Sequence, residues 1–259
     1  MNLELENKTA LVTGSTKGIG FAIAKTLAAE GAKVIVNGRS EASAQEAAEK
    51  IGKGARGVSA DLSTAAGCDT LIAAVGSVDI LVNNTGIFEP KPFAEIPDAD
   101  WDRFYQVNVM SGVRLTRALF PGMLEKNWGR VIFISSESGV QIPEEMIHYG
   151  LTKAAQLALV NGLSQLTKAT GVTVNAVLPG PTASEGVSDF VNQLASSSKQ
   201  TPEEFEKEFF RSVRPTSLLQ RFATVEEVAN TVAYICSTLA SATNGAAVRA
   251  DGGVLRATY

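Results

Sequence analysis

The chain alternates between short apolar runs and longer segments in which apolar residues recur with a helical period. The short runs are rich in Val, Ile and Leu, which is typical of strands buried on both faces, and the longer segments are typical of helices that cover a sheet. The runs predict strands at Thr9–Thr13, Lys33–Asn37, Gly57–Ala60, Val78–Asn83, Arg130–Ser135, Val172–Leu178 and Ala247–Ala250. The segments between them predict helices at about 19–30, 41–51, 66–74, 99–125, 149–169 and 224–239.

This alternation predicts an α/β fold, namely a doubly wound, Rossmann-like parallel sheet of about seven strands with helices on both faces. No linker or low-complexity stretch interrupts it, so we expect residues 1–259 to form a single domain. The least regular part, residues 181–215, is polar and fits two short amphipathic helices. It follows the sixth predicted strand at the edge where such sheets bind ligands, which favours a mobile substrate lid over an ordered packing insertion.

Composition narrows the class of protein. Hydrophobic residues make up 45% of the chain and the net charge is −4, so there is no basic footprint for nucleic acid. No apolar run approaches the roughly 18 residues that a membrane span requires. The N-terminus is acidic, which is not typical of a targeting segment. Cys68 and Cys236 lie far apart and His148 is the only histidine, so we expect a cytoplasmic protein with reduced thiols and no His/Cys metal site.

Candidate chemistry begins after the first predicted strand, where Gly14-Ser15-Thr16-Lys17-Gly18-Ile19-Gly20 opens a helix. Glycines let the backbone approach a pyrophosphate, and the helix presents free N–H groups to it. A glycine turn alone is equally typical of a tight connection without a ligand. Polar residues at two further strand ends, Asp61-Leu62 and Asn83-Asn84-Thr85-Gly86, favour a dinucleotide site.

The end of the second strand bears on which cofactor binds. NAD-binding chains usually place an acid there to accept from the ribose 2′-hydroxyl, but here the sequence is Asn37-Gly38-Arg39-Ser40, with no carboxylate before Glu41. Lys17 and Arg39 suit a 2′-phosphate, although both could also be solvated surface cations. We therefore expect NADP(H) in preference to NAD(H).

A second group of residues suggests proton transfer. Tyr149 and Lys153 stand four residues apart, hence on one face of a helix, and Ser136 ends the fifth strand. A free phenol titrates near pH ~10, and a neighbouring ammonium favours the phenolate. A Tyr and a Lys four residues apart usually lie on an exposed helix face and have no catalytic role. Ser136 favours a catalytic role here, because it ends a strand that would face the same crevice.

At these residues the chain resembles the classical branch of the short-chain dehydrogenase/reductase family, over essentially its whole length. The resemblance rests on a set of short motifs in a fixed order. These are Thr13-Gly14-x3-Gly18-Ile19-Gly20, Asp61, Asn83-Asn84-x-Gly86, Asn108, Ser136, Tyr149-x3-Lys153, Pro179-Gly180 with Thr182, and Gly245-x5-Asp251-Gly252-Gly253. Thr85 departs from the alanine usual in the family.

The resemblance implies roles for these residues. Tyr149 would be the general acid/base, Ser136 would hold the substrate oxygen, and Lys153 would bind the nicotinamide ribose and lower the tyrosine pKa. Asn108 would order a water in a proton relay. Thr182 would hold the carboxamide and Asp61 would contact adenine.

The expected reaction is the NADPH-dependent interconversion of a carbonyl and an alcohol, on a small ketone, sugar or hydroxyacyl compound. The chain could instead be a 3-oxoacyl-[acyl-carrier-protein] reductase, although relatives acting on that acidic carrier tend to carry basic residues where this chain has Asn127 and Thr170. It could also be an NAD-linked alcohol dehydrogenase. A non-enzymatic dinucleotide sensor would share the fold, but the intact catalytic set argues against it. Residues 141–147 should line one wall of the substrate cleft. Glu144 and Glu145 in that wall would disfavour an anionic substrate if they point inward, but we expect them to face solvent.

We also expect an oligomer, because the predicted helices 99–125 and 149–169 are apolar on several faces. The resemblance implies a homotetramer in which these helices pair across a two-fold axis. The apolar residues concerned are Phe104, Val107, Val109, Leu115, Ala154, Ala155, Leu157, Leu159 and Leu163.

Overall fold

A parallel sheet of seven strands runs through the centre of the molecule in this computed structural model, which describes residues 2–184 and 201–257. The strand order is β3-β2-β1-β4-β5-β6-β9, and every pairing in the sheet is parallel. The strands are β1 (Thr9–Val12), β2 (Lys33–Gly38), β3 (Arg56–Ser59), β4 (Ile80–Asn83), β5 (Gly129–Ile134), β6 (Val172–Pro179) and β9 (Ala247–Ala250). The chain order reverses between β1 and β4, which is where ligands bind in doubly wound sheets.

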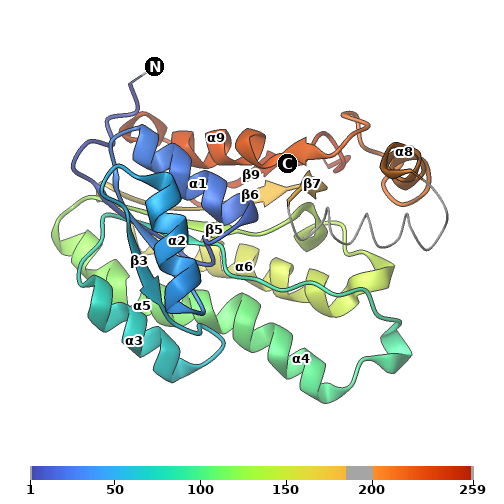
Figure 1. Ribbon diagram of the computed structural model, residues 1–259, viewed down its shortest axis with the longest axis horizontal. Coiled ribbons are helices and arrows are strands. Elements are labelled where there is room, and N and C mark those ends of the chain that lie inside the picture. The colour runs from blue at the N-terminus through green and yellow to red at the C-terminus, as the bar shows by residue number, and fades with distance from the viewer. Residues whose placement is uncertain (1, 185–200, 258–259) are drawn as a thin grey trace.

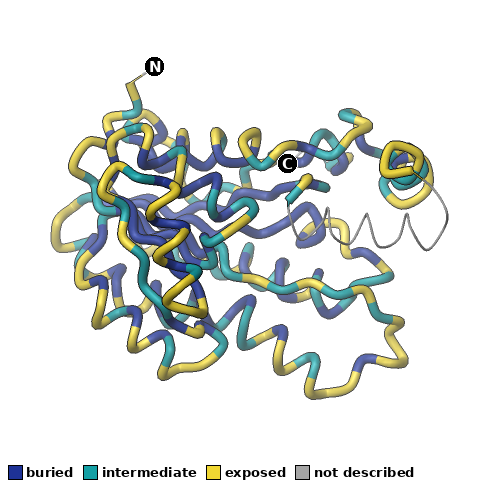
Figure 2. Tube along the Cα trace, viewed as in Figure 1, coloured by how far each residue is buried: buried dark blue, intermediate teal, exposed yellow. Residues whose placement is uncertain are grey.

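Helices cover both faces of the sheet, as Figure 1 shows. One face carries α1 (Gly18–Ala29), α2 (Glu41–Ile51) and α9 (Val225–Cys236). The other carries α3 (Ala65–Val75), α5 (Ser111–Glu125) and α6 (Ile147–Gln165). The sheet strands form the buried centre between these layers (Figure 2). The fold class and each predicted strand are confirmed.

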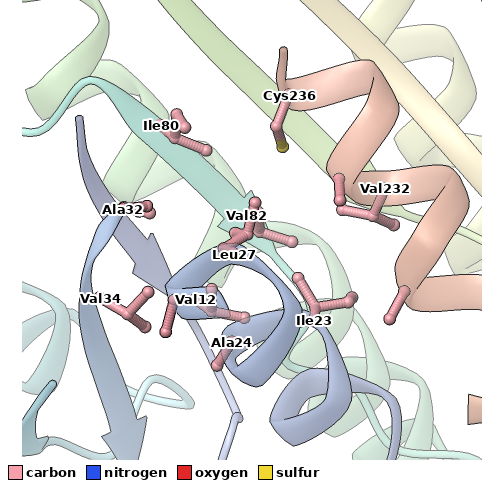
Figure 3. Close-up of a cluster of buried hydrophobic side chains, with 14 of the residues drawn as sticks. Val12, Ile23, Ala24, Leu27, Ala32, Val34, Ile80, Val82, Val232 and Cys236 are labelled. Atoms are coloured by element: carbon pink, nitrogen blue, oxygen red, sulfur yellow. The ribbon is translucent and has the colours of Figure 1, made fainter. Parts of the chain in front are cut away.

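The hydrophobic core consists of two apolar layers, one on each face of the sheet. Figure 3 shows part of the first layer, in which Val12 and Val82 of the sheet lie beside Ile23 and Leu27 of α1, with Val232 of α9 packed against them. All five residues are fully buried. Because α1 is anchored by this packing, its amino end is fixed at the carboxyl end of β1.

The predicted helix 99–125 is interrupted by a π-helical turn. It consists of α4 (Asp98–Tyr105), the π-helical turn Gln106–Met110 and α5 (Ser111–Glu125). Tertiary hydrogen bonds accompany the irregular turn, because the Asn108 side chain bonds to both backbone polar groups of Ile87. Periodicity along the sequence gives no sign of this turn, since it depends on a segment about 20 residues away.

The irregular region after β6 contains a small two-stranded sheet, β7 (Thr182–Ala183) with β8 (Ala223–Thr224), and the helix α8 (Pro202–Ser212). Figure 1 places α8 at the end of the molecule where β7 lies. Thr201 begins α8 with a capping box that includes Glu204. One of the two helices expected between 181 and 215 is therefore present. The other, around Phe190, Val191 and Leu194, lies outside the described residues.

Three of the apolar residues that we took as signs of oligomerisation are already buried within a single subunit. Phe104, Val109 and Leu115 are buried in the subunit itself, so that part of the argument was wrong. Leu151 and Leu166 of the 147–166 region are instead 47% and 62% exposed. Among the helices of the described ranges, none is long and apolar enough to cross a membrane.

Candidate active site

The carboxyl ends of β1, β4, β5 and β6 border a cavity of about 620 Å³. Helix α6 supplies Tyr149 and Lys153 to the same cavity. The structure brings together most of the predicted site residues at its lining. They are Lys17, Gly18, Ile19, Gly20, Asn84, Gly86, Ser136, Tyr149, Lys153, Pro179, Gly180 and Thr182.

The glycine turn has a shape that fits a pyrophosphate. Gly14 and Gly18 have φ angles of +56° and +60°, in the region that favours glycine. Helix α1 begins at Gly18, and its N-cap residue Lys17 makes no side-chain capping hydrogen bond. The first backbone N–H groups of α1 therefore remain available at the cavity wall, where they and the helix dipole favour an anion.

Two residues predicted to contact the cofactor instead hold this turn in place from behind. Ser15 is fully buried, and its hydroxyl donates to Val12 and accepts from the backbone N–H of Asn37. The Asn37 amide donates to the carbonyls of Gly38, Val58 and Ala60 on neighbouring strand ends, while its oxygen accepts from Gly14 N–H at 3.2 Å. Neither lines the cavity, so both support the turn from behind the cavity surface.

The region where a 2′-phosphate is expected carries exposed cations. Lys17 and Arg39 are both exposed, and within the described part of the chain neither forms an ion pair. The first carboxylate after β2, on Glu41, accepts a hydrogen bond from Ser59 at 2.8 Å. Asp61 is exposed at the end of β3, with Leu62 buried beside it.

The cavity wall formed by β4 and β6 is built by close backbone approaches. The Asn84 amide donates to the carbonyls of Thr13 and Gly14, at 2.9 and 3.0 Å, and so ties β4 to the glycine turn. At Gly180 a Cβ atom would lie 2.5 Å from the carbonyl of Asp251, so only glycine fits. Thr182 follows in β7 and donates to the Gly180 carbonyl. The unusual Thr85 hydroxyl is buried and has no hydrogen-bond partner among the described residues.

Ser136 and Tyr149 both line the cavity wall. The Ser136 oxygen accepts from the backbone N–H of Ser138 at 3.1 Å, which fixes its position after β5. Burial raises the pKa of Tyr149 to about 12, and the neighbouring Ser136 side chain opposes that shift. Tyr149 therefore holds its proton at neutral pH and can donate it to an oxygen atom beside Ser136.

Lys153 is buried one helical turn from the tyrosine. Its ammonium donates to the carbonyl of Ile134 at 2.8 Å and lies 5.6 Å from the centre of the Tyr149 ring. Burial lowers the pKa of Lys153 to about 7, because the charged form loses its hydration. The structure alone therefore does not reproduce the expected lowering of the phenol pKa. Tyr149 is itself desolvated, and the lysine charge is turned towards a backbone carbonyl.

Residues 8–195 match the sequence profile of a family described as short chain dehydrogenase. The chain belongs to the short-chain dehydrogenase family. It is 49% identical to the uncharacterized oxidoreductase YvaG of Bacillus subtilis (strain 168), over 264 residues and 100% of both chains. It is 35% identical to the 3-oxoacyl-[acyl-carrier-protein] reductase FabG of Aquifex aeolicus (strain VF5), with coverage of 98% of this chain and 100% of the relative.

Among solved structures, the chain is similar to L-sorbose reductase from Gluconobacter frateurii, determined in complex with NADPH and L-sorbose. The TM-score is 0.93 at 30% identity, with coverage of 99% of this chain and 100% of the other. This short-chain dehydrogenase is thus an NAD(P)-dependent oxidoreductase, and the coarse functional prediction is confirmed.

Gln156 is a residue of this dehydrogenase site that the sequence did not single out. It is buried on α6, donates to the backbone carbonyl of Asn108 at 2.6 Å, and lies with Oε1 3.5 Å from the Lys153 ammonium. The Asn108 side chain is held by Ile87 and by Thr152. The backbone carbonyl of Asn108, the residue expected to order a relay water, is therefore bonded to a glutamine side chain that also reaches the lysine.

Two further charged residues in the cavity, Glu137 and Arg214, were also missed, and both interact with Glu145 or with each other. Glu137 and Glu145 both accept hydrogen bonds from Arg214, and all three line the cavity. The expectation that the 141–147 wall turns its acids to solvent is met by Glu144, which is exposed, but was wrong for Glu145. No sequence signal marked Arg214, because its partners stand 69 and 77 residues away.

Proposed function

We propose that this short-chain dehydrogenase interconverts a carbonyl and an alcohol with NADP(H), and that Tyr149 is its general acid/base. The observation that carries the proposal is that Ser136 and Tyr149 line the same cavity wall, with Lys153 one helical turn from Tyr149 and also lining the cavity. When bound, the nicotinamide supplies or accepts the hydride. Ser136 holds the substrate oxygen, and Tyr149 gives it a proton in reduction or takes one in oxidation.

A tyrosine whose pKa is about 12 is suited to the reductive direction, because it stays protonated at neutral pH. Lys153 is placed to bind the nicotinamide ribose, since it lines the cavity at the end of β5. A Cβ atom at Gly86 would lie 3.5 Å from the lysine ammonium, so glycine keeps the approach to that group open.

Replacing Tyr149 by Phe tests the proton donor. General acid catalysis is worth about 10²–10⁴-fold, so we expect turnover to fall by that factor while NADPH still binds. Tyr234→Phe, on the exposed surface of α9, is the matched control and should keep wild-type activity. Near-normal kcat in Tyr149→Phe would refute the mechanism.

The preference for NADP(H) is supported by the two exposed cations and by the engagement of Glu41 with Ser59. Fluorescence titration of NADPH and NADH should show tighter NADPH binding, weakened about tenfold in Arg39→Ala and in Lys17→Ala. NADH binding should not change in either variant. Lys33→Ala is the control, because Lys33 is an exposed cation at the opposite end of β2. Preference for NADH, unaffected by these variants, would contradict the assignment.

The substrate proposed is a small molecule, with a carrier-linked 3-oxoacyl chain as the alternative that the similarity to FabG favours. The two surface positions that would suit a carrier lack cations. Asn127 instead accepts from Gly171 N–H at 2.8 Å, and the neighbouring Lys126 lies 3.5 Å from Asp79. A carrier-bound substrate reduced with a higher kcat/KM than its free short-chain analogue would establish the alternative.

A further inference from the structure

A buried charge network occupies one part of the substrate cavity, and we name it the Arg214 triad. Its members come from three separate segments. Glu137 directly follows Ser136, Glu145 lies in the short 3-10 helix Glu144–Met146 before α6, and Arg214 follows α8. Arg214 Nε is 3.0 Å from Glu137 and its Nη1 is 3.1 Å from Glu145. The side chains of Glu137, Arg214 and Glu145 are 5%, 11% and 38% exposed, so the exposed end of the triad is at Glu145.

The charge of the triad is unfavourable for an anionic substrate. It contains one guanidinium and two carboxylates, and the guanidinium is already engaged by both acids. Burial raises the pKa of Glu137, and the Arg214 guanidinium opposes that shift. A substrate carboxylate placed against Glu145 would meet a negative charge that Arg214 does not cancel, and like charges at short range cost several kcal/mol.

The remaining hydrogen-bonding capacity of the triad matches a hydroxyl group. Arg214 uses Nε and Nη1, the latter also for the Val213 carbonyl, and Glu145 uses Oε1. Among the described residues, Arg214 Nη2 and Glu145 Oε2 have no partner. This leaves one donor and one acceptor on neighbouring side chains that line the cavity. A hydroxyl group can accept from the first and donate to the second, whereas a carboxylate can only accept.

The cavity lining also includes aromatic rings. Phe209 of α8 lies 6.4 Å from Phe205 and 5.2 Å from Phe222, measured between ring centres, and all three line the cavity. Such rings pack against the C–H groups of a substrate but offer no partner for a negative charge. The lining therefore suits a molecule with carbon-bound hydroxyls and no anionic group.

We propose that the Arg214 triad binds a hydroxyl group of the substrate, so that the enzyme acts on neutral hydroxylated ketones and discriminates against keto acids. The inference rests on the proposed function of the same site. It assigns to Glu137, Glu145 and Arg214 a role in substrate choice, whereas Ser136 and Tyr149 hold the reacting oxygen.

The test compares three small ketones that differ in one substituent. Hydroxyacetone, butanone and pyruvate each carry a methyl ketone, next to a hydroxymethyl, an ethyl and a carboxylate group respectively. With NADPH and the wild-type enzyme, we expect kcat/KM for hydroxyacetone to exceed that for pyruvate by at least about tenfold, and to exceed that for butanone. The carbonyl group of pyruvate is intrinsically more reactive towards reduction, so a lower kcat/KM for pyruvate would have to come from the enzyme.

Glu145→Gln is the decisive variant, because it removes one charge at the exposed end of the triad while keeping the side-chain shape. We expect the ratio of kcat/KM for pyruvate to that for hydroxyacetone to rise about tenfold. Glu144→Gln is the matched control, since Glu144 is the adjacent acid of the same short helix, is exposed and does not line the cavity. It should leave the ratio unchanged.

The outcomes distinguish the role of the Arg214 triad from the proposed function of the site. The triad proposal would be refuted if the enzyme reduced all three ketones but preferred pyruvate. It would also be refuted if Glu145→Gln and Glu144→Gln gave the same ratio of kcat/KM for pyruvate to that for hydroxyacetone. Either result would leave the proposed function intact. No reduction of any ketone with either cofactor would overturn the proposed function, and the inference with it.

Discussion

Replacing Gln156 by Glu tests whether this side chain controls the charge of Lys153. The Gln156 Oε1 atom lies 3.5 Å from the lysine ammonium, and burial lowers the pKa of Lys153 to about 7. A carboxylate at this distance would attract the ammonium by about 4 kcal/mol at an effective dielectric constant of about 20. One pKa unit corresponds to about 1.4 kcal/mol, so the pKa of Lys153 should rise by about 1–3 units once desolvation of the new carboxylate is included.

The assay is an NMR titration of the apoprotein labelled with ¹³C at lysine Cε. In the wild type, one lysine resonance should titrate near pH 7, well below the ordinary lysine range near pH ~10.4. It should be missing in Lys153→Met, which assigns it. In Gln156→Glu the same resonance should titrate above about pH 8.

The matched control is Gln165→Glu, at an exposed position near the end of the same helix. That variant should leave the low-pKa resonance in place. An unshifted titration in Gln156→Glu, in a protein that remains folded, would refute the contact between Gln156 and Lys153. A wild-type protein in which no lysine titrates below about pH 9 would refute the lowered pKa itself.

Three further predictions follow from burial and packing. Burial lowers the pKa of His148 in the folded protein, whereas the pKa in the unfolded chain is near 6.5, so the free energy of unfolding should fall as pH drops below about 6.5. Urea midpoints should show this loss of stability in the wild type and less of it in His148→Leu. Equal pH dependence of the two midpoints would contradict the prediction. Gly20→Ala would place a Cβ 2.5 Å from the Gly14 carbonyl and should destabilise the fold by about 1–3 kcal/mol in thermal unfolding, whereas Gly162→Ala, with open space around it, should not; equal melting temperatures would contradict the packing. Light scattering at micromolar concentration should give a homotetramer, with a smaller mass for Leu166→Lys, and a wild-type monomer would refute the assembly.

The sheet could be predicted because its strands are buried on both faces. Runs such as Val172–Leu178 are nearly all apolar or β-branched, and such a run is typical of a central parallel strand. The candidate catalytic residues could also be found, because the spacing from Tyr149 to Lys153 and the serine at a strand end are local patterns. The structure brings Ser136, Tyr149 and Lys153 to one cavity.

The contacts of some site residues show what local patterns omit. Asn37 was predicted to contact the cofactor because it stands at the end of the second strand, and its side-chain amide donates to three strand-end carbonyls. Gln156 looked like an ordinary polar residue on a helix, although it is buried against Asn108. The contacts of Asn37 and Gln156 form only once the sheet and its helices have assembled, so the spacing of residues along the chain does not predict them.

The π-helical turn at Gln106–Met110 has a consequence for the length of the long helix that contains it. In a regular α-helix, Phe104 and Leu115 would share one face, because 11 residues make slightly more than three full turns. Here Phe104 packs on His148 of α6, 4.0 Å away between ring centres, while Leu115 joins the apolar layer under the sheet. The extra residue in the turn rotates the two halves by about a quarter turn relative to each other, so that each half can face its own neighbour. Deleting a single residue between 106 and 110 would restore a regular helix and set these two packing surfaces against one another. The chain should therefore tolerate substitutions on the outer side of this helix far better than any change in its length.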